Sequence, residues 1–179
     1  RSNNIVADAV QRLASGKILG WFQGRMECGP RALGHRSILA SPLSPEMKEV
    51  VNSRIKHREN FRPFAGAVPI EHVAEFFELE RPSPYMQFVV PVKQAAEARI
   101  PAVVHFGTCR VQTVDRASDP LFHALLVEFG KLTGSPILLN TSFNDADEPI
   151  VCSPTDAVHT FLRTNLDALI IGRFVVERK

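Results

Sequence analysis

Segment 24–37 could bind an anion, because it combines three glycines and three arginines in a short stretch. It reads Gly24-Arg25-Met26-Glu27-Cys28-Gly29-Pro30-Arg31-Ala32-Leu33-Gly34-His35-Arg36-Ser37. Glycine lets the backbone approach a ligand closely, and each guanidinium offers a planar fork that matches phosphate or carboxylate oxygens. The spacing fits neither the Walker phosphate loop nor the dinucleotide fingerprint. We therefore expect a different anion-binding loop, with a surface loop of solvated arginines as the alternative.

A second cationic segment covers residues 56–64. Lys56 lies where the helix that begins near Ser44 should end, and a cation is favourable there through the helix dipole alone. A basic C-terminal turn is therefore one interpretation. The order Phe61-Arg62-Pro63-Phe64 favours another, because two aromatic residues and a proline restrict the backbone around Arg62. We predict that Arg62 presents a fixed guanidinium.

Short amide and hydroxyl side chains follow the apolar strand predicted at 136–139: Asn140, Ser142 and Asn144. In α/β sheets ligands bind beyond the carboxyl ends of strands, so these residues could contact phosphate or sugar oxygens. An ordinary Asx turn is the alternative. A weaker signal is Gly107-Thr108-Cys109-Arg110, in which Arg110 could add another cation.

The remaining composition excludes several classes of protein. Neither the six histidines nor the three cysteines show metal-ligand spacing, so we predict no metal bound by this chain. An odd number of cysteines indicates a reducing, cytoplasmic location. No apolar run approaches the roughly 20 residues of a membrane span, so no membrane partner is expected.

Charge is unevenly distributed along the chain. The net charge is +2, but residues 23–62 hold eight Lys or Arg and four Glu, so this segment carries +4 and the rest carries −2. A local basic cluster on a nearly neutral protein is more typical of a small-anion site than of a nucleic-acid surface. Nucleic acid is therefore not the expected partner.

Helices and strands alternate irregularly along the chain, which predicts an α/β or α+β layer fold. Helices are expected over 3–15, from Ser44-Pro45, from Asp119-Pro120 for about 13 residues, and from Ser153-Pro154 for about 11. Segment 93–110 is expected to be a loop. Strands are expected at 18–22, 37–40, 65–69, 86–91, 111–114, 136–139, 168–171 and 174–176. Length favours one domain over 1–179, and the absence of an initial methionine suggests a piece of a longer protein.

From about residue 17 to 177 the chain closely resembles the C-terminal domain of the O-carbamoyltransferases that include nodulation proteins and antibiotic-tailoring enzymes. The motifs that carry the resemblance are GWFQGRMECGPRALGHRSILA, MKEVVNSRIKHRENFRPFAGAV, HFGTCRVQTV, LLNTSFND followed by EPIV, and FLRTNLDALIIG. Several long motifs in the same order make the resemblance specific.

The resemblance implies a YrdC-like fold, a twisted open mixed sheet with flanking helices. It also implies a transferase that converts carbamoyl phosphate and ATP, with Mg²⁺ on the nucleotide, into carbamoyl-adenylate. An N-terminal actin-like domain of the same protein, absent from this chain, would hold a metal and pass the carbamoyl group to an acceptor hydroxyl. Full turnover would need that domain.

The resemblance also assigns roles by motif position. The family's Lys, Arg, Ser and Asn fall on Lys56, Arg62, Ser142 and Asn144, and its extra arginines fall on Arg31 and Arg110. Together with the residue chemistry above, this predicts catalytic roles for Lys56, Arg62 and Arg110, and substrate or nucleotide binding by Arg31, Asn140, Ser142 and Asn144. Two segments depart from the family pattern. The turn His105-Phe106-Gly107 is one residue shorter, and Asp145-Ala146-Asp147-Glu148 replaces a loop that often carries Arg and Gly. Carboxylates pointing into an anion site would oppose phosphate binding.

Two other functions remain open from the sequence. YrdC-like folds can present a positive concave surface to RNA, although a single Trp and a single Tyr offer little base stacking. The domain could also be a catalytically silent scaffold for its missing partner.

Overall fold

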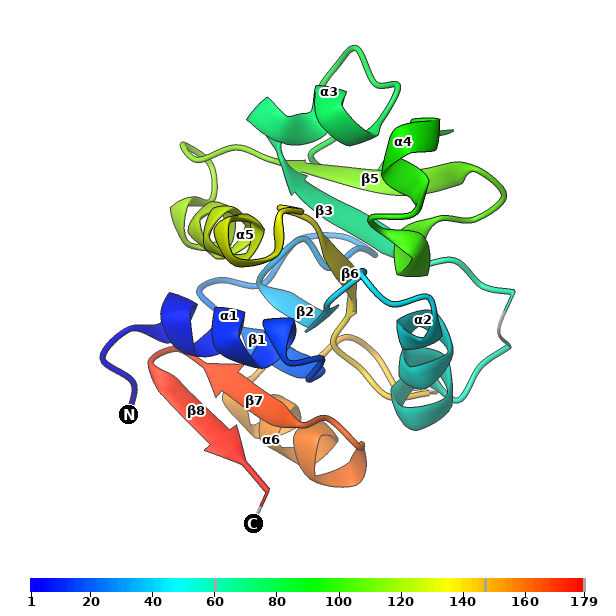
Figure 1. The fold of residues 1–179 in the computed structure, drawn as a ribbon. Coiled ribbons are helices and arrows are strands. Elements are labelled where there is room, and N and C mark those ends of the chain that lie inside the picture. Colours follow the sequence, from blue (N-terminus) through cyan, green and yellow to red (C-terminus); the bar gives the residue numbers. More distant parts are fainter. Residues whose placement is uncertain (60, 147, 179) are drawn as a thin grey trace.

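The computed structural model describes all residues except 60, 147 and 179. Within that part of the chain, one mixed sheet has the strand order β4-β5-β3-β6-β2-β1-β7-β8 (Figure 1). Strands β1 and β7 pair in parallel, as do β3 and β5, and the other neighbours are antiparallel. The strand bounds are β1 Leu19–Phe22, β2 Arg36–Ala40, β3 Ala65–Pro69, β4 Phe88–Pro91, β5 Thr108–Val114, β6 Leu138–Ser142, β7 Ala168–Ile171 and β8 Phe174–Glu177.

Helices cover both faces of this sheet. The helix bounds are α1 Ile5–Ala14, α2 Glu46–Val51, α3 Val73–Phe76, α4 Gln94–Glu97, α5 Pro120–Thr133 and α6 Pro154–Arg163, with the π-helix η1 Asn52–Lys56 and the 3₁₀ turns η2 Ile70–His72 and η3 Pro101–Val103. Helices α1 and α5 lie side by side over one face (Figure 1). Because side chains alternate along a strand, Leu138 packs with α1 and α5, whereas Leu139 packs with residues of α2 and α6. This layered arrangement confirms the expected α/β fold with flanking helices.

Two of the three predicted N-caps are confirmed. The Asp119 carboxylate accepts a bond from the Phe122 amide at 3.0 Å, and Ser153 forms a capping box with Asp156. The prediction for Ser44 was wrong, because α2 begins without a side-chain cap. The Ser44 hydroxyl instead contacts the Glu46 carboxylate.

Two other expectations about the elements were wrong. Strand β6 does not end at residue 139 but continues through Asn140 and Ser142, whose backbones pair with β2 and β3. Segment 93–110 is not a loop: it contains α4, η3 and the start of β5. Helices of four and three residues are too short to show an apolar period in the sequence. No helix of the described residues has the length and apolar character needed to cross a membrane.

Candidate functional site

The candidate site lies where four central strands have neighbouring ends. Ser142 at the end of β6 pairs with Ser37 at the start of β2, and Ala65 at the start of β3 pairs with both Asn140 and Arg110. Only β6 therefore contributes its carboxyl end, while β2, β3 and β5 contribute their early residues. The expected position beyond carboxyl ends holds for β6 alone, because β6 runs antiparallel to both of its neighbours.

A pocket of about 270 Å³, here called the arginine pocket, opens at this edge. Four guanidinium groups contribute to its lining, from Arg31, Arg58, Arg62 and Arg110, and no carboxylate of the described residues does so. Burial and then the neighbouring Arg31 lower the pKa of Arg110. The remaining lining residues are Pro30, Ala32, Pro63, Phe64, Ala65, Met86, Asn140, Thr141 and Ser142. Crowded like charges in a concave site favour an anionic ligand.

A second pocket of about 310 Å³, here called the lysine pocket, shares Arg58, Arg62 and Ser142 with the first. It adds Lys56, His57, Asn144, Asp145 and Ala146 to the shared wall. The two pockets together bring all seven predicted residues into one region of the fold: Arg31, Lys56, Arg62, Arg110, Asn140, Ser142 and Asn144.

Lys56 reaches this region because α2 continues directly into the π-helix η1, which ends at that residue. Its side chain is buried, and Nζ donates to the Ser142 carbonyl at 2.6 Å and to Asn144 Oδ1 at 2.7 Å. A third contact joins Nζ to the Asn144 carbonyl at 3.0 Å, and the Ser142 hydroxyl donates to Asn144 Oδ1 at 2.7 Å. The ammonium thus fixes the turn that follows β6.

Burial first, and then the nearby Arg58, lower the pKa of Lys56 from 10.5 to about 7. Asp145 and Glu148 oppose this shift. The charge beside the lysine pocket therefore changes close to neutral pH, where a lysine in water stays protonated.

Arg58 is the fixed guanidinium, and the prediction that Arg62 would be fixed was wrong. Phe61 is 69% exposed, and the Arg62 side chain is 54% exposed, with its Nε 3.2 Å from Glu59. Arg58 Nε donates to Asn52 Oδ1 at 2.9 Å, and its guanidinium lies 4.5 Å from the centre of the Phe64 ring. The sequence reasoning missed Arg58, although a second cation two residues beyond Lys56 was a usable signal.

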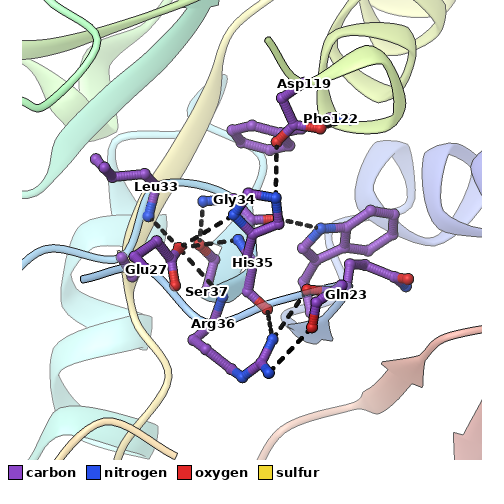
Figure 2. Close-up of polar contacts among 12 residues, drawn as sticks. Gln23, Glu27, Leu33, Gly34, His35, Arg36, Ser37, Asp119 and Phe122 are labelled. Atoms are coloured by element: carbon purple, nitrogen blue, oxygen red, sulfur yellow. Dashed lines mark hydrogen bonds and ion pairs between the residues drawn. The ribbon is translucent and has the colours of Figure 1, made fainter. Parts of the chain in front are cut away.

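The loop before β2 is organised by the buried Glu27 carboxylate (Figure 2). Its Oε1 accepts bonds from the amides of Leu33 at 2.5 Å, His35 at 2.9 Å and Arg36 at 3.3 Å. The bond from Leu33 to Glu27 closes residues 27–33 into a compact loop, and Arg31 within this loop lines the arginine pocket. Glu27 was not among the predicted site residues, because a lone glutamate in a basic segment carries no distinctive spacing.

The three arginines of this loop have different environments. Arg36 is buried over the Phe22 ring at 3.5 Å and donates to the carbonyls of Gln23 at 2.9 Å and His35 at 3.0 Å (Figure 2). Its guanidinium holds the loop and does not line either pocket. Arg25 is exposed and also lines neither pocket, so Arg31 is the one arginine of this loop that lines the arginine pocket.

The side-chain amides of Gln112 and Asn140 connect this loop to the arginine pocket. The Gln112 Nε2 donates to the Leu33 carbonyl at 2.6 Å, and the Gln112 Oε1 accepts from Asn140 Nδ2 at 2.8 Å. Asn140 is almost fully buried and lines the arginine pocket. Its Oδ1 has no hydrogen-bond partner among the described residues, which is costly for a buried amide oxygen.

The two segments that depart from the family pattern have separate outcomes. The Glu148 carboxylate turns toward α6, where it contacts Arg163 and accepts a bond from the Thr160 hydroxyl at 2.8 Å. Asp145 does line the lysine pocket, and Asp147 lies outside the described residues. The shortened turn around Phe106 precedes β5 and leaves Arg110 on the arginine pocket.

Comparisons with known proteins agree with this geometry. The family model described as "Carbamoyltransferase C-terminus" matches residues 10–178. Over its whole length the chain is 48% identical to Nodulation protein NolO of Bradyrhizobium diazoefficiens and 46% identical to Nodulation protein NolNO of Sinorhizobium fredii. It spans 33% and 27% of those two proteins.

Solved structures with the same fold are far more distant in sequence. Sua5 of P. abyssi, solved with L-threonine, gives a TM-score of 0.64 at 15% identity, over 94% of this chain and 46% of Sua5. Full-length HypF, solved in a phosphate- and nucleotide-bound form, gives 0.62 at 19% identity, over 99% of this chain and 22% of HypF. These likenesses confirm the expected YrdC-like fold. With its family model matched over nearly the entire sequence, the chain belongs to the carbamoyltransferase C-terminus family.

Proposed function

We propose that this chain is the adenylate-forming part of an O-carbamoyltransferase, which binds carbamoyl phosphate and ATP and produces carbamoyl-adenylate. The observation that carries the proposal is the arginine pocket, where four guanidinium groups converge without an opposing carboxylate among the described residues. The adjoining lysine pocket gives a second concave surface for a second phosphate-bearing substrate. The nucleotide-bound form of HypF, which shares the fold, is consistent with this proposal.

The proposed reaction has two steps. Water first splits carbamoyl phosphate into carbamate and inorganic phosphate. A carbamate oxygen then forms a bond to the α-phosphorus of ATP, the bond from that phosphorus to the β-bridging oxygen breaks, and pyrophosphate leaves with the electron pair. Both steps bring anions together, so fixed cations would offset their repulsion and stabilise charge on phosphoryl oxygens.

The protein side chains divide between these tasks. Arg31, Arg58 and Arg110 would hold phosphate oxygens in the arginine pocket, and Arg62 would bridge the two pockets. Because its protons already bond to oxygens of Ser142 and Asn144, Lys56 would act by its charge and by holding that turn.

Mg²⁺ would arrive with the triphosphate. The described residues include no group of three His, Cys, Asp or Glu side chains placed to hold a metal ion, and Asp145 is the one carboxylate on the lysine pocket. The site residues therefore do not fit a protein-held Mg²⁺. We further propose that transfer to an acceptor hydroxyl takes place on an N-terminal actin-like domain of the same protein.

Carbamoyl-phosphate-dependent ATP–pyrophosphate exchange tests the assignment. We expect exchange by the unaltered chain and its loss in Lys56→Ala and Arg62→Ala, with native far-UV circular dichroism. Arg25→Ala is the matched control, since Arg25 is exposed and lines neither pocket. Full exchange in both site variants would refute the roles. Ligand binding without exchange by the unaltered chain would instead favour a scaffold domain.

A further inference from the structure

We propose that Gln112 makes the arginine pocket selective for a phosphate ligand that carries an N–H group, by fixing the amide of Asn140 with its oxygen free for the ligand. The inference rests on the proposed function and goes one step further, because it explains how carbamoyl phosphate would be distinguished from other acyl phosphates. Gln112 has no place in the roles assigned above.

The orientation of the Gln112 amide is set by the loop before β2. Its Nε2 donates to the Leu33 carbonyl at 2.6 Å, and a carbonyl can only accept, so the nitrogen must face Leu33. The Gln112 oxygen is then left to face Asn140. Gln112 is buried in the central part of β5, which prevents water from replacing either bond.

The orientation of the Asn140 amide follows from that of Gln112. Nδ2 of Asn140 donates to Gln112 Oε1 at 2.8 Å, with a longer contact to the Ala32 carbonyl at 3.4 Å. Reversing the Asn140 amide would place its oxygen against two other oxygens, so the reversed form is unfavourable. Oδ1 of Asn140 is consequently a buried acceptor without a partner among the described residues, in a residue that lines the arginine pocket.

The ligand that completes this site must have two properties. It needs anionic oxygens for the guanidinium groups, which only donate hydrogen bonds, and it needs an N–H for Asn140 Oδ1. Carbamoyl phosphate has both, since its amino group lies one carbon from the phosphate ester oxygen. Acetyl phosphate has nearly the same shape, but its methyl group would leave the buried oxygen unpaired. A site built to accept a hydrogen bond rejects an analogue that lacks the donor.

Calorimetric titration with inorganic phosphate, carbamoyl phosphate and acetyl phosphate tests the proposal. For the unaltered chain we expect carbamoyl phosphate to bind at least about tenfold more tightly than acetyl phosphate, the usual effect of one unpaired buried acceptor. Gln112→Met should bring this ratio close to one while the affinity for inorganic phosphate stays within about twofold.

The outcomes separate this inference from the proposed function. Equal binding of the two acyl phosphates by the unaltered chain, or an unchanged ratio in Gln112→Met, would overturn the role of Gln112 and leave the anion pocket standing. Failure of all three phosphates to bind would refute the proposed function itself.

A nuclear magnetic resonance measurement covers the case in which Gln112→Met does not fold. The side-chain amide protons of Asn140 in the unaltered chain should exchange slowly, and carbamoyl phosphate should leave their exchange unchanged. A large change on ligand addition would mean that Nδ2 meets the ligand, and the proposal would then be wrong.

Discussion

Raising the pH should weaken anion binding at this site through a single group, Lys56. Its pKa is lowered to about 7, so at pH 6 about nine molecules in ten carry the charge and at pH 8 about one in eleven does. If the bound anion needs that charge, its association constant should be nearly constant below pH 7 and should fall about tenfold per unit above it. Between pH 6 and pH 8 the loss is therefore about tenfold.

Titration calorimetry with sulfate measures this dependence, because sulfate itself does not titrate between pH 6 and pH 9. In Lys56→Met the affinity should be lower and should lose the tenfold step, which separates Lys56 from histidines that titrate nearby. A flat profile for the unaltered chain, or the same slope in Lys56→Met, would refute the reasoning.

Folding stability should change with pH in the opposite direction. Between pH 7 and 10.5 the unfolded chain binds a proton on Lys56 that the folded chain lacks, so this group raises the free energy of unfolding as the pH increases. Below pH 7 both states hold the proton and the contribution becomes constant. Weaker sulfate binding above pH 7 thus cannot be attributed to loss of the fold through this group.

Three further predictions concern the loop and the fixed cation. Gly34→Ala should lower the free energy of unfolding by about 3 kcal/mol in urea titrations, since φ is +112° and a Cβ would lie 2.4 Å from an aromatic carbon. Gly29→Ala, where φ is +136° but the surrounding space is open, should lower it by about 1 kcal/mol. Equal losses in the two variants would contradict the steric cause. Glu27→Ala leaves three amides without their acceptor, so it should lower the free energy of unfolding by about 2 kcal/mol and weaken phosphate binding. Glu27→Gln should have a milder effect on both. Unchanged phosphate affinity in the alanine variant would show that the loop closed by Glu27 does not position the pocket. Arg58→Ala should raise the Kd for phosphate by about 10-fold to 100-fold in calorimetry, and Arg25→Ala should leave it unchanged. Similar effects of the two variants would indicate a general charge effect instead of a fixed contact.

The elements with strong local signals were predictable from the sequence. Asp119-Pro120 and Ser153-Pro154 combine a capping side chain with a proline at the first helical position, and helices begin at both. The loop predicted at 93–110 failed for the opposite reason. Its helical turns gain their stability from burying single residues such as Ala96 and Ile100, and burial of this kind depends on the tertiary fold.

The sequence predicted which residues form the candidate site but not how their side chains are held. Residue chemistry and the family resemblance together identified seven side chains that the fold brings together. The fixed guanidinium was assigned to Arg62 because of its aromatic neighbours in sequence. In the structure the useful ring is Phe64, and the contact with Arg58 spans six residues of backbone. The amide chain through Gln112 joins residues 28 and more positions apart, so it has no local signature.

The pairing of β6 between β2 and β3 makes the chemistry sensitive to insertions and deletions. Alternate residues of a strand face opposite sides, so Asn140 and Ser142 belong to one side of the sheet and Leu139 and Thr141 to the other. Removing one residue ahead of Asn140 would exchange the two sets and put a threonine where the amide acceptor stands. Length changes among natural relatives should consequently be confined to the turns outside this strand.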